Sequence, residues 1–246
     1  MTKAIKLSAR LKCICDMVQD GANKKIHGAD IGCDHGYISI YLVQEKIADR
    51  MLAMDINEGP LKRAEENIRE YALSDRIETR LSDGLSALSH KEADTVIIAG
   101  MGGKLMADIL FKDKDKLKGI DSLVLQPQSD IPEFRRELIK NGFEIADERI
   151  IYDEGKYYFP MRAKRCVEDE ASLFEYLSND IYMIYGKHTL EEKSHVMQDY
   201  LLKQKKKLDK IKEELAENET DRAADRLTAI EREIDITERA LNYMQA

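Results

Sequence analysis

Carboxylates and glycines gather at the points where short apolar runs of the sequence end. Residues 30–37 read Asp-Ile-Gly-Cys-Asp-His-Gly-Tyr, so Gly32 and Gly36 allow a tight turn between a strand and a helix. The first N–H groups of that helix are free to bind a carboxylate. An anionic Asp34 repels a pyrophosphate but suits an ammonium group. Although glycine-rich turns occur in many α/β proteins, this one predicts a site for a small ligand that carries positive charge.

Two further acids follow the next apolar runs. Asp55 lies 25 positions after Asp30 and ends the second run, where an acid typically hydrogen-bonds ribose hydroxyls. Asp83 and Gly84 follow the third run, in the place expected to meet an adenine ring. These carboxylates could instead cap helices. Their order along the chain nevertheless predicts the binding of a nucleoside.

The fourth and fifth runs end in glycines and an amide rather than in acids. The fourth opens into Gly100-Met101-Gly102-Gly103, and the fifth ends in Gln126-Pro127. The glycines leave space for a ring to approach and expose backbone polar groups. Because ligands bind at the carboxyl edge of open α/β sheets, these residues predict the mouth of the same site.

The elements that must position these groups alternate between strand and helix from residue 26 to about 165. That order predicts a parallel sheet with helices on both faces. The last two strands are separated only by residues 152–155, which is too short for a parallel crossover, so they must form a hairpin. The fold class is therefore α/β, doubly wound, with five parallel strands and a terminal antiparallel hairpin, as in class I methyltransferases. The expected strands are 26–31, 50–55, 76–80, 93–99, 121–126, 143–151 and 156–164, and the expected helices are 37–48, 59–71, 82–91, 104–117 and 132–140.

From residue 168 onward, Lys, Glu, Leu and Arg dominate and proline is absent, so we expect two domains, 1–167 and 168–246. Two heptad-like stretches predict an antiparallel coiled-coil hairpin with a turn at 217–221. Because the apolar seam can close within one chain, we expect a monomer, with a homodimer through the coiled coil as the alternative. The seam residues are Met197, Leu201, Gln204, Leu208, Ile211 and Leu215, then Ala223, Leu227, Ile230, Ile234, Thr237, Leu241 and Met244.

The first of these helices carries a basic run within an otherwise acidic protein. Charge runs are usually solvated helix faces, but this one is also suited to contacts with RNA phosphates. The lysines are Lys203, Lys205, Lys206, Lys207, Lys210 and Lys212. A second basic segment surrounds Arg10 near the N-terminus.

Taken together, six motifs resemble those of one family, the bacterial tRNA (adenine(22)-N1)-methyltransferases. They are 7–11, 30–37, Asp55 with Gly59-Pro60, 83–85, 99–103 and 125–127. The resemblance runs from about residue 5 to 165, and the helical tail is similar in kind to that family's extra domain. It implies transfer of a methyl group from S-adenosylmethionine to N1 of an adenosine in the D-arm region of tRNA.

The motifs and the resemblance together assign a set of site residues. No residue is assigned as a catalytic base, because N1 of adenine is neutral at pH 7 and its lone pair is available. His35, Tyr37 and Tyr152 are candidate contacts for an unstacked base, with a structural role as the alternative for each. The expected cofactor-binding residues are Asp30, Gly32, Cys33, Asp34, Gly36, Tyr37, Asp55, Ile56, Asn57, Asp83, Gly84 and Gly100, and the expected substrate-binding residues are Arg10, Met101, Gly102, Gly103, Gln126, Pro127, Lys205, Lys206 and Lys207.

Composition narrows the class of protein. The formal net charge is −8, so RNA binding depends on local basic patches rather than on overall charge. No apolar run is long enough to span a membrane, and the N-terminal segment lacks the apolar stretch of a signal peptide. Four cysteines are too few for a disulfide framework, so we expect a cytoplasmic protein with reduced thiols. The histidines and Cys13-x-Cys15 lack the spacing of metal ligands, so we expect no metal.

Three other functions stay open at this point. The chain could methylate a protein or a small molecule, although the basic helix favours a large anionic substrate. It could be a non-enzymatic adaptor that pairs through the coiled coil. A dehydrogenase is a third alternative, but Gly32 and Gly36 are four residues apart and do not form G-x-G-x-x-G.

Overall fold

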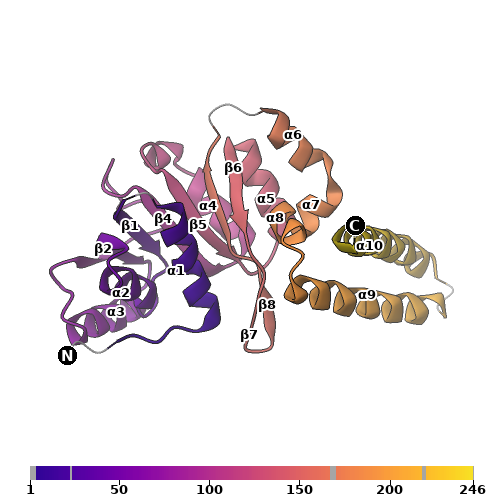
Figure 1. Cartoon of the computed structure of the whole chain (residues 1–246), viewed down its shortest axis with the longest axis horizontal. Helices are drawn as coiled ribbons and strands as arrows, with labels where there is room; N and C mark the ends of the chain where they lie inside the picture. Colours follow the sequence, from indigo (N-terminus) through magenta and orange to yellow (C-terminus); the bar gives the residue numbers. More distant parts are fainter. Residues whose placement is uncertain (1–3, 23, 167–169, 218–219, 246) are drawn as a thin grey trace. The chain divides into compact units, whose positions relative to one another are not determined.

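The computed structural model describes residues 4–22, 24–166, 170–217 and 220–245. The chain folds into two compact units, Met1–Asp169 and Glu170–Ala246, and Figure 1 labels most of the elements of both. The boundary expected between residues 167 and 168 lies outside the described residues.

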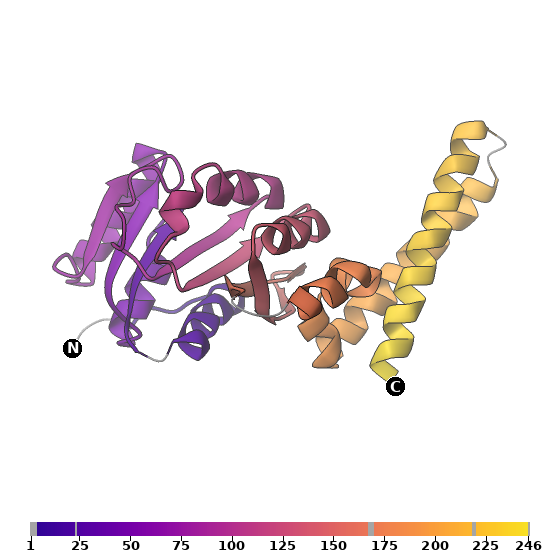
Figure 2. The same cartoon turned by 90° about the horizontal axis from the view of Figure 1, so that it is seen from above.

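The first unit is built around one sheet of seven strands in the order β3-β2-β1-β4-β5-β9-β6. The first five of these strands run parallel, which confirms the doubly wound α/β fold class. Figure 2 shows α4 and α5 together on one face of the sheet and α1 on the other. The elements are α1 (Ala9–Gly21), β1 (Ile26–Ile31), α2 (Tyr37–Gln44), β2 (Ala48–Asp55), α3 (Glu58–Glu70), β3 (Ile77–Leu81), β4 (Thr95–Met101), α4 (Gly103–Phe111), the short 3-10 helix η1 (Lys114–Leu117), β5 (Ser122–Pro127), α5 (Ile131–Lys140), β6 (Phe143–Glu148), β7 (Ile151–Asp153), β8 (Lys156–Tyr158) and β9 (Met161–Arg165).

The terminal hairpin is present but is divided into two parts. In the main sheet β9 lies between β5 and β6 and runs antiparallel to both. The segment that connects β6 to β9 forms a separate two-stranded ribbon, β7–β8. Figure 1 shows this ribbon extending beyond the end of the main sheet. The expected strands 143–151 and 156–164 are therefore each interrupted near the point where the ribbon leaves the sheet.

Three expected helices are corrected by the structure. The helix expected over 104–117 ends at Phe111, and the separate 3-10 helix η1 follows it. The helix expected over 37–48 ends at Gln44, because Lys46 adopts a left-handed conformation (φ +59°) and Ala48 already begins β2. The helix expected over 82–91 is a series of turns. There the Ser82 hydroxyl donates to the Gly84 carbonyl and accepts from the Ala87 N–H, so side-chain hydrogen bonds replace the helical ones.

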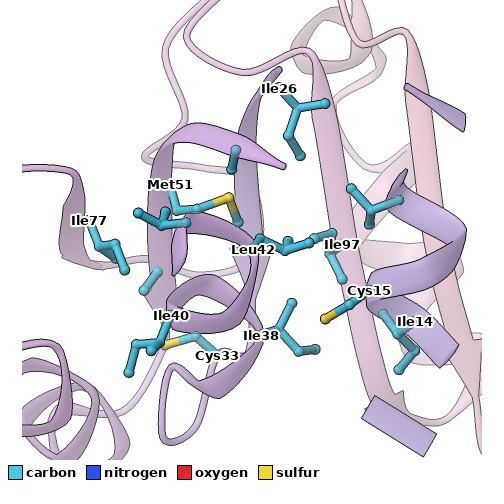
Figure 3. Close-up of a cluster of buried hydrophobic side chains, with 14 of the residues drawn as sticks. Ile14, Cys15, Ile26, Cys33, Ile38, Ile40, Leu42, Met51, Ile77 and Ile97 are labelled. Carbon is cyan, nitrogen blue, oxygen red and sulfur yellow. The ribbon is translucent and has the colours of Figure 1, made fainter. Parts of the chain in front are cut away.

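Helix α1 was not expected from the sequence. Ser8 caps it by accepting a hydrogen bond from the Leu11 N–H. Its buried positions include Ile14, Cys15 and Val18, at the three- and four-residue spacing of a helix face. Figure 3 shows Ile14 and Cys15 in one buried cluster with residues of β1, α2 and β4. This burial, at about 1.5–3 kcal/mol for a large aliphatic side chain, anchors α1 on the sheet.

The second unit contains five helices within the described residues. Ion pairs Lys212–Glu231 (2.8 Å) and Lys205–Glu238 (3.2 Å) link α9 to α10. From the first pair to the second, the residue number decreases by seven on α9 and increases by seven on α10. The two helices are therefore antiparallel, as expected. Of the expected turn at 217–221, residues 218 and 219 lie outside the described residues. The helices are α6 (Glu170–Ser178), α7 (Asp180–Tyr185), α8 (Lys187–Glu191), α9 (His195–Ala216) and α10 (Asp221–Gln245).

Helices α6, α7 and α8 were not separated by sequence reasoning. The Tyr185 hydroxyl forms a 2.7 Å hydrogen bond with Thr237 of α10. The Tyr182 ring packs edge-on against Tyr243, also on α10. These short helices therefore depend on tertiary contacts more than on their own hydrophobic periodicity.

Candidate functional site

A cavity of about 560 Å³ opens at the carboxyl edge of the parallel strands in the first unit. It lies beside the junction of β1 and β4, where the strand order changes direction. Ligands of doubly wound sheets bind at this kind of junction. The loops that follow β1, β2, β3 and β5, and the end of β4, all contribute to its wall. Lining residues that follow these strands are Asp30–Tyr37 without Gly36, Asp55–Asn57, Ser82–Gly84, Ala99–Met101 and Gln128.

The loop after β1 depends on its glycines. Gly32 has φ +72°, and a Cβ added there would lie 2.1 Å from the Cε atom of Met101. Gly36 has φ +71° and directly precedes α2. It does not line the cavity. Asp34 is itself left-handed (φ +47°), a conformation that Asp adopts more readily than most residues. An aspartate can therefore occupy a left-handed position in this loop.

Asp30 is the most deeply buried carboxylate of the site, with 2% of its surface exposed. The Ser39 hydroxyl donates a hydrogen bond of 3.1 Å to its Oδ2 atom. The pKa of Asp30 is raised to about 7, mainly by burial, with a further contribution from the nearby Asp55 carboxylate and with the hydrogen bonds from Ser39 opposing the change. A carboxyl group with this pKa is only partly ionised at neutral pH and gains from a nearby cation.

The other three acids differ in their exposure. Asp55 is buried, and its Oδ1 atom accepts a hydrogen bond of 2.8 Å from the Asn57 N–H. Asp34 is exposed and lies 3.3 Å from Arg63. Asp83 is also exposed and lies 3.5 Å from Lys112. The four carboxylates line one cavity, as predicted from their order after the strands.

The charge of the cavity selects among cofactor classes. Its lining contains four carboxylates, whereas Arg10 is its only lysine or arginine side chain within the described residues. Such a lining repels the pyrophosphate of a dinucleotide and attracts a cation. A nucleoside that carries sulfonium and ammonium groups therefore fits the residues that are present.

Arg10, Gln126 and Gln128 form the polar corner of the site. The Arg10 guanidinium on α1 donates a hydrogen bond of 2.8 Å to Gln126 Oε1 and lies 5.4 Å from the centre of the Tyr158 ring. The backbone N–H of Arg10 donates to Asp153, at the tip of the β7–β8 ribbon. Gln128 lines the cavity and was not among the expected site residues. The repeated Gln-Pro-Gln was the only sequence signal for it.

Several expected substrate residues shape the wall without lining it. Gln126 is fully buried and holds Arg10, while Pro127 pairs with Met101 between β5 and β4. Gly102 directly precedes α4. A Cβ at Gly103 would lie 2.7 Å from the Ser129 carbonyl oxygen, so this glycine allows close packing rather than ligand access.

Three aromatic candidates are placed differently. The rings of His35 and Tyr37 stack with centroids 5.3 Å apart, and both residues line the cavity. Tyr152 lies on the β7–β8 ribbon, is 49% exposed and packs against Tyr157. It does not line the cavity.

The basic run on α9 is largely engaged in ion pairs. Lys205 contacts Asp209 (2.9 Å) and Glu238 (3.2 Å). Lys206 and Lys207 are exposed, and no carboxylate of the described residues lies within ion-pair distance of either. Of the three lysines expected to bind RNA, these two are the more available.

The described residues hold neither a metal site nor a membrane-spanning helix. No group of three or more His, Cys, Asp or Glu residues is arranged to hold a metal ion in residues 4–22, 24–166, 170–217 and 220–245. Across the same part of the chain, none of the helices combines the length and apolar character that a membrane crossing requires.

Comparisons with known proteins agree with this site. Residues 7–161 match the family described as "Methyltransferase domain". The tRNA (adenine(22)-N(1))-methyltransferase of Bacillus subtilis is 35% identical over 192 residues, which cover 78% of each chain. The crystal structure of the B. subtilis m1A22 tRNA methyltransferase superposes with a TM-score of 0.83 at 30% identity, over 96% of this chain and 99% of that one. A Streptococcus pneumoniae protein in complex with S-adenosyl-L-methionine gives a TM-score of 0.82 at 26% identity, over 96% and 100% of the two chains.

These matches extend through the loops that line the cavity and on into the helical unit. The resemblance seen in the sequence motifs is thereby confirmed, and the chain belongs to the tRNA (adenine(22)-N1)-methyltransferase family.

Proposed function

We propose that this protein transfers a methyl group from S-adenosylmethionine to N1 of adenosine 22 in tRNA. The observation that carries the proposal is the cavity itself. Carboxylates after β1, β2 and β3 are arranged for a cationic nucleoside, and the end of β4 leaves an open corner for a second ring. The tRNA substrate follows from the family to which the chain belongs.

The residues around the cavity suit separate parts of the cofactor. Asp55 is proposed to bind the ribose hydroxyls, and its Oδ1 atom accepts a hydrogen bond from the Asn57 N–H. Asp83 and Gly84 line the cavity, and we propose that they contact the adenine ring. Asp30 and the loop after β1 are suited to the methionine end, whose ammonium and sulfonium groups are cations.

The reaction requires alignment more than acid–base chemistry. When bound, S-adenosylmethionine supplies a methyl group whose bond to sulfur breaks as the N1 lone pair forms the new N–CH3 bond, and the S–CH3 electron pair stays on sulfur. No proton has to be removed from N1, which agrees with the lack of an assigned general base. The protein therefore contributes by holding the ring in line with the methyl group and excluding water. The target base must leave its stack to enter the cavity.

The second unit is proposed to contact tRNA phosphates through Lys206 and Lys207 on α9, with Lys205 contributing only if its ion pairs open. We propose that the protein is a monomer, because buried seam residues such as Leu201 and Leu241 already pack within one chain. We also propose a cytoplasmic location, where tRNA is present.

The test is a transfer assay with labelled S-adenosylmethionine and two unmodified tRNA transcripts, one with adenosine and one with guanosine at position 22. Labelled 1-methyladenosine is expected only from the first. Asp55→Ala should abolish it, whereas Asp49→Ala, an exposed acid on the same strand, should not. Cofactor binding without any labelled tRNA would overturn the substrate and favour a protein or small-molecule methyltransferase.

A further inference from the structure

Two polar side chains from distant parts of the sequence converge above Gly100, at the end of β4. A Cβ added at Gly100 would lie 3.7 Å from Gln128 Nε2 and 3.8 Å from Arg10 Nη1. Both side chains also line the cavity. This corner lies at the end of β4 and the loop after β5, whereas the acids expected to bind the cofactor follow β1, β2 and β3. A base presented to the methyl group would meet this corner.

The two side chains differ in how they are held. Arg10 is fixed by Gln126, by the Tyr158 ring and, through its backbone, by Asp153. The backbone of Gln128 is fixed because its N–H donates a hydrogen bond of 2.9 Å to the Met101 carbonyl. Its side-chain amide is exposed and makes no hydrogen bond with any residue in the described part of the chain. The amide of Gln128 is therefore available to a ligand, on a backbone that does not have to move.

The two side chains also differ in their chemistry. A guanidinium offers donors only, whereas the amide of glutamine offers both a donor and an acceptor. Adenine presents an N6 donor beside an N7 acceptor, which a glutamine amide matches with two hydrogen bonds. Guanine presents two acceptors on the same edge and does not match. Recognition of N6 and N7 also leaves N1, on the adjoining edge of the ring, free to face the methyl group.

We propose that Gln128 is the residue that selects adenine, by accepting a hydrogen bond from N6 and donating one to N7 of the target base. The inference rests on the proposed function, because it names the residue that recognises the adenine methylated in that reaction. It also predicts an effect on rate. As N1 forms its bond to the methyl group, the ring becomes cationic, so the N6–H donor strengthens and its bond to Gln128 tightens.

The test pairs a change in the protein with a change of one atom in the RNA. Single-turnover methylation is measured for wild type and Gln128→Ala, with adenosine or 7-deazaadenosine at position 22 of the tRNA. For wild type, loss of the N7 acceptor should slow methylation by about 3–10-fold, as expected for one hydrogen bond. Gln128→Ala should slow methylation of adenosine by about 10–100-fold. It should show no further loss with 7-deazaadenosine, because the partner of N7 is already absent.

Three controls keep the outcomes separate. Gln19→Ala changes an exposed glutamine of α1 outside the cavity and should behave as wild type with both RNAs. Calorimetry should give wild-type affinity of Gln128→Ala for S-adenosylmethionine, which shows that the variant is folded. If it does not fold, Gln128→Glu replaces it, and should be slowed with adenosine because a carboxylate cannot donate to N7.

Two results would overturn the role of Gln128 and leave the proposed function intact. One is wild-type rates for a folded Gln128 variant with adenosine, and the other is an equal penalty for 7-deazaadenosine in wild type and variant. A wild-type protein that makes no 1-methyladenosine on any tRNA would instead overturn the proposed function, and this inference with it.

Discussion

Replacing Asp30 by asparagine should stabilise the ligand-free protein at pH 8 while weakening its binding of S-adenosylmethionine. Asparagine keeps the shape of the side chain, and its carbonyl oxygen can still accept the hydrogen bond that the Ser39 hydroxyl donates to Asp30. What the substitution removes is a carboxylate that is 2% exposed. Other acidic groups that face it are Asp55 on β2, Cys15 on α1 and Cys33, and burial keeps the two thiols neutral by raising their pKa values.

The size of the effect follows from the pKa of Asp30. Its ordinary value of 3.8 is raised to about 7 in the folded protein. Below about pH 3 the side chain is neutral in both the folded and the unfolded states, so the wild type loses nothing there. As the pH rises towards 7, the unfolded chain ionises first, and the folded state loses stability by about 1.4 kcal/mol for each pH unit. Above pH 7 the loss levels off at about 4 kcal/mol, which is an upper limit because the folded protein relaxes around a charge.

Urea unfolding of the ligand-free wild type and Asp30→Asn, followed by circular dichroism at pH 5, 6, 7 and 8, measures this difference. The variant should be more stable at every pH, and its advantage should grow between pH 5 and 7 and then level off. Ser86→Ala, a polar side chain outside the cavity lining, controls for a general effect of substitution. Parallel pH profiles for wild type and Asp30→Asn would refute the assignment of a raised pKa to Asp30.

The charge of Asp30 should have the opposite effect on ligand binding, which it should strengthen. A sulfonium cation favours the ionised form of Asp30, so binding should release protons and strengthen as the pH rises from 6 to 8. S-adenosylhomocysteine carries the same amino-acid group without the sulfonium charge, so it corrects for titration of the ligand's own amine. Asp30→Asn should therefore weaken S-adenosylmethionine more than S-adenosylhomocysteine in calorimetry. Equal weakening of both would show that Asp30 acts on the shape of the loop rather than on charge.

Two further predictions concern the RNA contact and the loop after β1. The double variant Lys206→Gln/Lys207→Gln should weaken tRNA binding. It should also make the negative slope of log affinity against log salt shallower by about 1–2. Lys210→Gln, whose side chain is paired with Glu214, should change this slope less. An unchanged slope would remove α9 from the interface. Gly32→Ala should cost about 1–2 kcal/mol for its left-handed backbone, and more because its Cβ meets Met101. Urea unfolding should show part of that loss recovered in Gly32→Ala/Met101→Ala, and no recovery would show that the contact with Met101 adds no cost.

The sheet was predictable from local sequence because each parallel strand is a short apolar run with a turn at its end. The acids at these ends lie on one cavity for the same reason, since parallel strands share a carboxyl edge. Helix α1 was missed although Ser8 and the spacing of Ile14 and Val18 indicate a helix. Its place is fixed by contacts with α2 and the sheet, which the local sequence does not show.

The polar corner could not be predicted, because it is assembled from distant residues. Gln126 and Gln128 are two positions apart and chemically identical, yet one is buried and the other lines the cavity. The two glutamines also differ in their partners. Arg10, which lies 116 positions before Gln126, donates a hydrogen bond to the side-chain oxygen of Gln126. The placement of Arg10 depends in turn on Asp153 and Tyr158 of the ribbon β7–β8. No spacing rule within the Gln-Pro-Gln run contains that information.

The distribution of charge explains how a protein with a net charge of −8 can act on RNA. Four carboxylates of the first unit line a cavity suited to a cationic cofactor, while the exposed lysines Lys206 and Lys207 lie on α9 of the second unit. During the reaction the positive charge passes from the cofactor sulfur to the adenine ring, and we expect both groups to lie in the cavity that the same carboxylates line. Their attraction is therefore similar before and after transfer, so it contributes to binding more than to rate. Acceleration must then come from groups whose contacts change as N1 becomes methylated. In this cavity the amide proposed to meet N6 is such a group, and the buried carboxylate of Asp30 is not.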